Sequence, residues 1–193
     1  MVDHLAEQAA VGPLDDTRYD DVLAFFGVNV NWSGAAVATG DPGIADVVRR
    51  EARALDARDY EGWLALFSPG CVYWVPRNDE VGDPRLEPSV HFDDYRRLAD
   101  RVALIRTGHL HAQTPPSRTS RVLSEVECRQ ATADLADVHS SLIVHEQRRG
   151  RSQVYAGRQF HRLERTGQGW QIRYRVLMLV DRDVSQGNTT FIL

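Results

Sequence analysis

The sequence predicts an α+β fold in which a curved, mainly antiparallel (mixed) sheet wraps over helices that precede it in the chain. Residues 51–76 have the pattern of helix, helix and then an aromatic strand. A run of strand-like segments follows residue 121, and short turns at 149–151 and 166–169 separate the last of them. Helices gathered first and strands afterwards are typical of an α+β domain, and the curl of such a sheet over its helices produces a cone.

The first helix of this cone begins at Asp41-Pro42, where proline suits the first turn. Apolar residues then recur every three or four positions, which predicts one buried stripe. Glu51 falls on the side that we expect to face solvent. The stripe consists of Ile44, Val47, Val48, Ala52 and Leu55.

A second helix and an aromatic strand follow. Asp59 is a suitable N-cap for this helix, whose apolar stripe ends at the breaker cluster Ser68-Pro69-Gly70. Residues 71–75 are rich in β-branched and aromatic side chains, which favours a strand, and Pro76 ends it. The helical stripe consists of Tyr60, Trp63, Leu64 and Phe67.

The rest of the chain alternates loops and regular segments. Residues 77–88 and 107–120 are polar or rich in proline and read as loops, whereas 91–105 has helical spacing. Apolar and polar residues alternate from Trp170 to Met178, which predicts a strand with one buried face. The expected strands are 121–128, 133–147, 153–165 and 169–181, with a further edge strand over 187–193.

We expect a single cone-shaped domain over residues 44–193, preceded by an N-terminal arm over 1–43. Residues 20–28 of the arm could form a short helix. The arm is either a mobile leader or a segment that packs on a neighbouring chain. Phe25, Phe26 and Trp32 favour packing, because large aromatic side chains are poorly placed in water.

Composition excludes several classes of partner. The chain has 193 residues, 23 basic and 27 acidic side chains and a net charge of −4, which favours neither nucleic acid nor an anionic membrane. No apolar run approaches the roughly 20 residues of a membrane helix, and the acidic N-terminus does not resemble a signal peptide. We therefore expect a cytoplasmic protein in which Cys71 and Cys128 are buried, unpaired thiols.

The sequence lacks the ligand patterns of common metal and nucleotide sites. A Rieske cluster needs two Cys and two His in closely spaced pairs, which the two distant cysteines cannot supply. His109 and His111 could join His91 or a neighbouring Asp in an iron site, but His-x-His on a polar loop is usually surface, so we expect no metal. Walker, GxGxxG, GxSxG and HExxH motifs are also missing from the sequence.

An alternative hypothesis is a stand-alone dehydratase or isomerase. A cone of this kind can enclose an apolar cavity, and a buried carboxylate paired with a His could abstract a proton there. The competing interpretation makes Asp56 a surface residue and His139 a wet or interfacial strand residue beside Ser141 and His145. The candidate catalytic residues are Asp56, Tyr60, His91 and His139.

An ordered set of short matches leads to a known family. It includes Leu55-Asp56, the strand Val72-Tyr73-Trp74-Val75-Pro76 and the loop Pro115-Pro116-Ser117-Arg118-Thr119. Tyr155-Ala156-Gly157-Arg158 and Gly169-Trp170-Gln171-Ile172 follow in the right order. Over residues 44–193 the chain resembles the β (small) subunit of aromatic-ring-hydroxylating dioxygenases, within the nuclear transport factor 2-like (cystatin-like) superfamily.

The resemblance implies a structural subunit of an oxidoreductase complex, without catalytic residues or cofactors of its own. It implies a homotrimer of β subunits within a hexamer of three α and three β chains. The Rieske [2Fe-2S] cluster and the mononuclear iron would then lie on the catalytic α subunit. The guanidinium group of arginine can make two-pronged contacts with a carboxylate of another chain, and an outward aromatic side chain can anchor an interface. Strand alternation would turn either Tyr73 or Trp74 outward. The interface candidates are Tyr73, Trp74, Arg101, Arg106 and Arg118.

Overall fold

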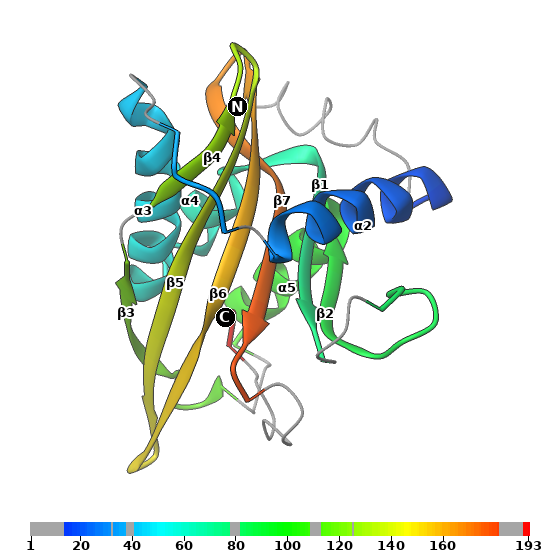
Figure 1. The fold of residues 1–193 in the computed structure, drawn as a ribbon. Helices are drawn as coiled ribbons and strands as arrows, with labels where there is room; N and C mark the ends of the chain where they lie inside the picture. Colours follow the sequence, from blue (N-terminus) through cyan, green and yellow to red (C-terminus); the bar gives the residue numbers. More distant parts are fainter. Residues whose placement is uncertain are drawn as a thin grey trace.

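A strongly curved sheet forms the body of the protein, and helices lie on both of its faces (Figure 1). The computed structural model describes residues 14–31, 33–37, 41–77, 82–108, 113–124, 126–181 and 191–193, apart from the side chains at positions 130 and 131. Its helices are α2 (Asp16–Val30), α3 (Pro42–Ala57), α4 (Tyr60–Leu64) and α5 (Tyr95–Arg106). Its strands are β1 (Phe67–Pro76), β2 (Ser89–Asp94), β3 (Arg118–Leu123), β4 (Glu127–Ala131), β5 (Leu135–Arg148), β6 (Arg151–Thr166) and β7 (Gly169–Leu179).

The strand order is β2-β1-β7-β6-β5-β3, and β4 pairs with a further stretch of β5. Only β1 and β7 run parallel to each other among these pairs. The predicted α+β class, with a curved mixed sheet over N-terminal helices, is confirmed. Among the described residues, no helix is both long enough and apolar enough to cross a membrane.

Local sequence explains where the helices begin. Asp41 accepts a hydrogen bond from the backbone N–H of Gly43 at 2.9 Å and is the N-cap of α3. Asp59 caps α4 in the same way, with its carboxylate 3.0 Å from the N–H of Gly62. Between them Arg58 adopts a left-handed φ of 59°, which ends α3 and redirects the chain into α4.

The long hairpin of β5 and β6 closes at Arg149-Gly150, where both residues have positive φ, 49° and 78°. Two consecutive positive φ values are the signature of a type I′ turn, whose twist matches that of the flanking strands. The hairpin turn predicted at 149–151 is therefore confirmed. The register of β5 with β6 is regular from Leu135–Glu164 to Arg148–Arg151.

Several predicted boundaries were wrong. Residues 89–94 form β2 rather than the start of a helix, and the predicted loop and strand over 107–128 instead contain two strands, β3 and β4. The breaker cluster 68–70 lies inside β1, where the pairing with β7 shifts between Phe67 and Val72. Residues 191–193 are buried but form no strand, and 187–190 lie outside the described residues.

Two apolar cores lie on opposite faces of the sheet. The larger core fills the concave side, where Trp63, Phe67 and Tyr73 pack together beneath α3, α4 and α5. The smaller core lies on the convex side, where α2 covers strands β1, β6 and β7. Because β7 is covered on both faces, nearly all of its residues are buried, and the predicted single buried face was wrong.

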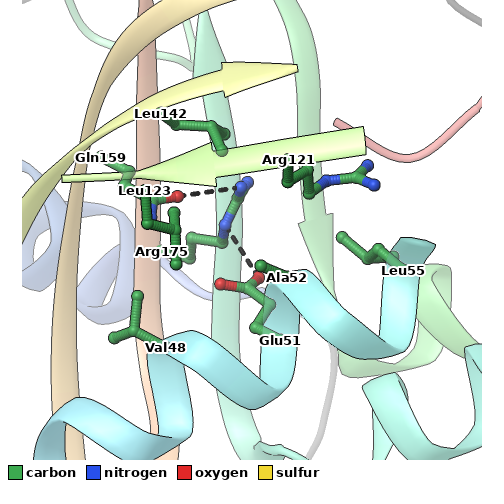
Figure 2. Close-up of a pocket in the computed structure, with 9 residues that line it drawn as sticks. All are labelled: Val48, Glu51, Ala52, Leu55, Arg121, Leu123, Leu142, Gln159 and Arg175. Atoms are coloured by element: carbon green, nitrogen blue, oxygen red, sulfur yellow. Dashed lines mark hydrogen bonds and ion pairs between the residues drawn. The ribbon is translucent and has the colours of Figure 1, made fainter. Parts of the chain in front are cut away.

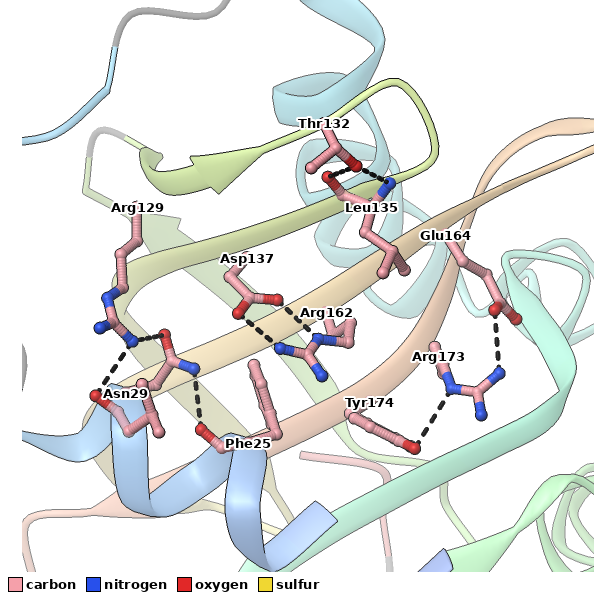
Figure 3. Close-up of polar contacts among 11 residues, drawn as sticks. Phe25, Asn29, Arg129, Thr132, Leu135, Asp137, Arg162, Glu164, Arg173 and Tyr174 are labelled. Carbon is pink, nitrogen blue, oxygen red and sulfur yellow. Dashed lines mark hydrogen bonds and ion pairs between the residues drawn. The ribbon is translucent and has the colours of Figure 1, made fainter. Parts of the chain in front are cut away.

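Polar contacts fasten α2 and brace the convex face (Figure 3). Arg129 of β4 donates to the backbone oxygen of Val28 at 3.0 Å, and Asn29 bonds the carbonyl of Phe25 at 2.8 Å. Beside them Arg162 makes a two-pronged ion pair with Asp137, at 2.7 and 2.8 Å. The described part of the predicted arm therefore packs on the sheet of its own chain.

Candidate functional site

The interior of the cone contains a buried group of polar side chains, which we name the interior polar cluster: Glu51, Trp63, Gln159, His161 and Arg175 (Figure 2 shows three of them). Glu51 is central. Its Oε1 lies 2.8 Å from Nε of Arg175, and its Oε2 lies 2.9 Å from Nε2 of His161. Its side of α3 was predicted to face solvent, but Glu51 is only 2% exposed. That prediction was wrong because α3 is covered by β6 and β7.

Other members of the interior polar cluster extend this network across the sheet. Trp63 donates to Glu51 at 3.4 Å, and Arg175 donates to Oε1 of Gln159 at 3.3 Å. Gln159 in turn donates to Ser140 at 2.8 Å. One charge pair thus ties α3, α4 and three adjacent strands together.

Electrostatics keeps this buried pair ionised. Burial alone would raise the pKa of Glu51, but Arg175 and the hydrogen bond with His161 outweigh it and lower the pKa to about 2. The pKa of Arg175 is raised by Glu51, although burial opposes that change. A carboxylate held this firmly in its charged form is a poor general base, because it does not take up a proton near neutral pH.

The last described residues close the concave side. Tyr73 donates its hydroxyl to the backbone oxygen of Leu193 at 2.6 Å, and Arg121 donates to that of Ile192 at 2.5 Å. Phe191 packs edge-on against Tyr155, with ring centroids 5.4 Å apart. All three tail residues are buried within the concave core, so this segment occupies space that an open cone would leave for a ligand.

The pocket beside Glu51, in the part of the chain that the structure describes, is too small for a ligand. The pocket between α3 and the sheet has essentially no volume, ≈ 0 Å³, that a water-sized molecule could occupy. Glu51 and Arg175 lie at its centre, with Gln159 at its edge (Figure 2). Its lining consists of Val48, Glu51, Ala52, Leu55, Arg121, Leu123, Leu142, Gln159 and Arg175.

The predicted Asp56–His139 pair is not formed. Asp56 accepts hydrogen bonds from the hydroxyl of Thr119 at 2.9 Å, from the backbone N–H of Arg121 at 2.7 Å and from its guanidinium at 2.6 Å. His139 lies on the convex face of β5, where its ring stacks on Phe160 and its Nδ1 lies 3.0 Å from Glu127. The sheet therefore separates the carboxylate from the imidazole.

The other two candidate catalytic residues lie on the concave side. His91 accepts from Arg101 at 3.2 Å, and burial, followed by the charge of Arg101, lowers the pKa of His91 to about 4. Tyr60 is half-buried, and burial raises the pKa of its hydroxyl. Tyr60 packs against the concave core, the ring of His91 lies 6.1 Å from that of Tyr73, and neither side chain lines the pocket beside Glu51.

The predicted interface residues divide into two groups. Tyr73 and Trp74 point to opposite faces, as alternation requires, but both are buried, because α2 places Phe26 against Trp74 at 5.1 Å. Neither aromatic is an outward anchor, so that part of the prediction was wrong. The predicted arginines are more accessible: Arg101 pairs with Asp93 at 2.7 Å, Arg106 is 76% exposed at its side chain, and Arg118 bonds Gln147 at 2.5 and 3.1 Å.

No cluster of three or more His, Cys, Asp or Glu side chains suited to a metal occurs in the part of the chain that the structure describes. His109 and His111, the predicted His-x-His pair, lie outside the described residues. Cys71 and Cys128 are buried and form no disulfide, as expected from the sequence. Burial raises the pKa of the Cys71 thiol, which makes it unreactive.

A curved sheet over three helices is also the fold of a nuclear transport factor 2-like protein with a cystatin-like fold from Novosphingobium aromaticivorans, with a TM-score of 0.53 at 16% identity, covering 88% of this chain and 93% of that one. The β subunit of benzoate 1,2-dioxygenase from Burkholderia mallei shares this fold. Its TM-score is 0.65 at 24% identity, covering 81% of this chain and all of that one.

The family model for the ring hydroxylating beta subunit matches residues 50–186, and the chain belongs to that family. It is 32% identical, over 63% of its length and 69% of the relative, to the small oxygenase component of the p-cumate 2,3-dioxygenase system of Pseudomonas putida. It is 30% identical to the 2-halobenzoate 1,2-dioxygenase small subunit of Burkholderia cepacia, over 67% of this chain and 82% of that one. The chain is thus a small subunit of a ring-hydroxylating dioxygenase, which implies a catalytic α partner.

Proposed function

We propose that this chain is a non-catalytic scaffold that assembles with its α subunit as three α and three β chains, around a homotrimer of β chains. The Rieske [2Fe-2S] cluster and the mononuclear iron would be held by the α subunit, which would insert oxygen into an aromatic ring. The observation that carries this proposal is the filled interior of the cone, where the interior polar cluster and residues 191–193 occupy the space.

A filled interior argues against independent catalysis by this chain. A dehydratase or isomerase of this fold would need a cavity that admits its substrate and a carboxylate free to accept a proton. Asp56 instead accepts hydrogen bonds from Thr119 and Arg121, and Glu51 is locked by Arg175. The interior side chains that could do chemistry are therefore used for structure.

We also propose an aromatic carboxylate as the substrate of the assembled oxygenase. The relatives at 30% identity or more are named for p-cumate, 2-halobenzoate, toluate and benzoate, all of which are aromatic acids. The relatives named for benzene and chlorobenzene are 28–29% identical. A cytoplasmic location completes the proposal, since two cysteines that form no disulfide suit a reducing compartment.

Arg106 and Arg118 are proposed contacts with a partner, because both side chains are accessible and neither is held by an ion pair shorter than 3.8 Å. Arg101 is a weaker candidate, since Asp93 already neutralises it at 2.7 Å. Exposed arginines of this kind can make two-pronged contacts with carboxylates of another chain.

Co-expression with the α subunit of the same organism tests the assembly. We expect a tagged α chain to retain this chain in equal amounts, with the mass of a hexamer by light scattering and with iron only in the α fraction. The chain purified alone should bind no stoichiometric iron. Failure of the two chains to co-purify, or iron and oxidation in the isolated small subunit, would overturn the proposed function.

The substrate class is tested on the same complex. Turnover with benzoate and 4-isopropylbenzoate should exceed turnover with benzene by at least about tenfold, which corresponds to about 1.4 kcal/mol of transition-state discrimination. Equal turnover of the uncharged ring would contradict an aromatic carboxylate as substrate, without affecting the assembly proposal.

A further inference from the structure

The convex face of the sheet consists of two halves that differ in cover. Helix α2 lies over β1, β7 and the part of β6 around Phe160, away from β3 (Figure 1), and buries Phe25, Phe26 and Val30 there. The contact of Arg158 with the backbone oxygen of Val30 marks where that cover ends. The remaining half of the convex face, formed by β3 and by the parts of β5 and β6 around Ile143 and Val154, contributes no described residue to the core beneath α2.

We name this surface the open half-face. Strand register places Val122 opposite Ile143 and Ile143 opposite Ala156, so these three side chains form one row across three strands. Val154 lies one step further along β6, opposite His145. The open half-face consists of Ser120 and Val122 of β3, Ser141, Ile143 and His145 of β5, and Val154, Ala156 and Arg158 of β6.

The apolar residues of the open half-face are unusually accessible. Val122, Ile143 and Val154 are 61%, 46% and 55% exposed. Their strand neighbours Leu142, Val144 and Tyr155 point into the concave core and are buried, so alternation sends the exposed residues outward. Single exposed valines are ordinary, but a contiguous apolar row framed by polar residues is typical of a protein-binding surface.

Charge indicates what kind of surface fits here. The polar frame contains His145 and Arg158, and Arg118 continues it along the outward side of β3. None of the residues of the open half-face carries a carboxylate. Glu146, the nearest acidic residue on β5, points to the other side and accepts a hydrogen bond from Ser117 at 2.6 Å.

A second copy docked through the same surface would offer Arg158 no carboxylate and would add a second basic frame to the first. Like charges facing one another across an interface are unfavourable and act against wrong partners. A surface that offers apolar side chains together with Asp or Glu would satisfy both the valine row and the basic frame. This complementarity favours a different chain over a twofold pair of small subunits.

We propose that the open half-face is where the catalytic α subunit docks, through a segment that combines apolar side chains with carboxylates. This inference rests on the proposed function and assigns its principal contact to one surface. Helix α2 then has a defined role: it covers the half of the convex face that is not needed for docking and leaves the open half-face accessible.

The test uses the double variant V122D/I143D, which places two carboxylates on the row, with L104D as the matched control. Leu104 lies on α5 and is 47% exposed, so it accepts the same change away from the open half-face. Tagged α subunit should bind V122D/I143D about tenfold more weakly or worse, and L104D as the wild type does. Each small subunit is also measured alone by light scattering and thermal unfolding.

A second pair of variants tests the charge argument. Ile143→Arg extends the basic frame, so it should weaken binding less than Ile143→Asp does, although both remove the same apolar side chain. Should the double variant misfold, Val154→Asp on β6 provides the same readout from another strand. Unchanged α binding by V122D/I143D or by Val154→Asp would overturn the inference.

The inference would also be overturned if V122D/I143D lost self-association of the small subunit but still bound the α subunit. The open half-face would then be occupied by a second copy of this chain. Failure of the proposed function looks different. In that case the wild-type chain and L104D would both fail to bind the α subunit, whereas failure of this inference alone leaves wild type, L104D and V122D/I143D binding equally.

Discussion

The concave and convex faces of one sheet differ in how their space is used. On the concave side, the described helices, the tail residues 191–193 and the pair Glu51–Arg175 fill the core, and the pocket between α3 and the sheet has ≈ 0 Å³ of room for water. On the convex side, α2 buries one half, while Val122 and Ile143 of the other half remain accessible. The comparison indicates that this small subunit acts through its outer surface, and that its interior serves stability.

The largest effect should come from breaking the buried charge pair. Glu51→Leu leaves Arg175 buried without a counter-ion, and we expect a loss of about 3–5 kcal/mol in the free energy of unfolding. Urea titration measures it, and E51L/R175M should recover much of the loss because both charges are gone. The exposed Glu61→Gln is the control and should change stability by less than about 0.5 kcal/mol. A small effect of Glu51→Leu would contradict this expectation, because it would mean that water reaches and solvates Arg175.

Helix α2 is tested next, because the comparison depends on its being part of the core. Phe26 is 1% exposed and packs on Trp74 and Phe160. Phe26→Ala should cost about 3–4 kcal/mol in thermal or urea unfolding, from lost burial and the cavity it leaves. Val28→Ala on the outer side of the same helix, where Val28 is 58% exposed, should be nearly neutral. Equal effects of the two variants would show that α2 does not cover the sheet.

A smaller effect is expected at Gly157, where the backbones of β6 and β7 approach closely. A Cβ added there would lie 2.2 Å from the backbone oxygen of Met178, so a strand must shift. Gly157→Ala should cost about 1–3 kcal/mol by the same urea titration. Gly167→Ala is the matched control, because no atom lies within 4 Å of its added Cβ. Tolerance of alanine at both positions would contradict the observed strand spacing.

The last prediction concerns pH. The pKa of His91 falls to about 4 in the folded protein, chiefly through burial and then through Arg101, with Asp93 opposing. As pH falls below 6.5 the unfolded chain binds this proton first, so the contribution of His91 to stability should decrease from pH 6.5 to 4 and then level off. Unfolding curves of His91→Gln should lack that decrease, and an unchanged pH profile would contradict the assignment.

Glu51 contributes in a lower pH window. Its folded pKa of about 2 lies below the ordinary value of 4.5, so its stabilisation is complete above pH 4.5 and is lost as pH falls toward 2. His91→Gln should leave this lower window intact. The two pH windows therefore report separately on His91, at the edge of the concave core, and on Glu51, at its centre.

The sequence was sufficient for the starts of α3 and α4, because apolar stripes and Asp caps are local signals, but the stripe from Tyr60 to Phe67 overran the end of α4 at Leu64. It was not sufficient for Glu51, whose partner Arg175 lies on a distant strand, so helical spacing alone marks Glu51 as exposed. The start of β2 was missed because Phe92, Tyr95 and Leu98 also fit helical spacing. The tail was predicted as an edge strand, but Arg121 and Tyr73 bind its carbonyl groups instead. These misses share one cause, which is that a contact made by folding outweighs a local pattern.

The central claim is that this chain supports catalysis without performing it. The most direct measurement is the turnover of the assembled complex, per α subunit, with Asp56→Asn in the small subunit. We predict turnover within about twofold of the wild-type complex, because Asp56 bonds only Thr119 and Arg121 among the described residues. A loss of about a hundredfold or more, in a complex that remains assembled, would contradict the claim.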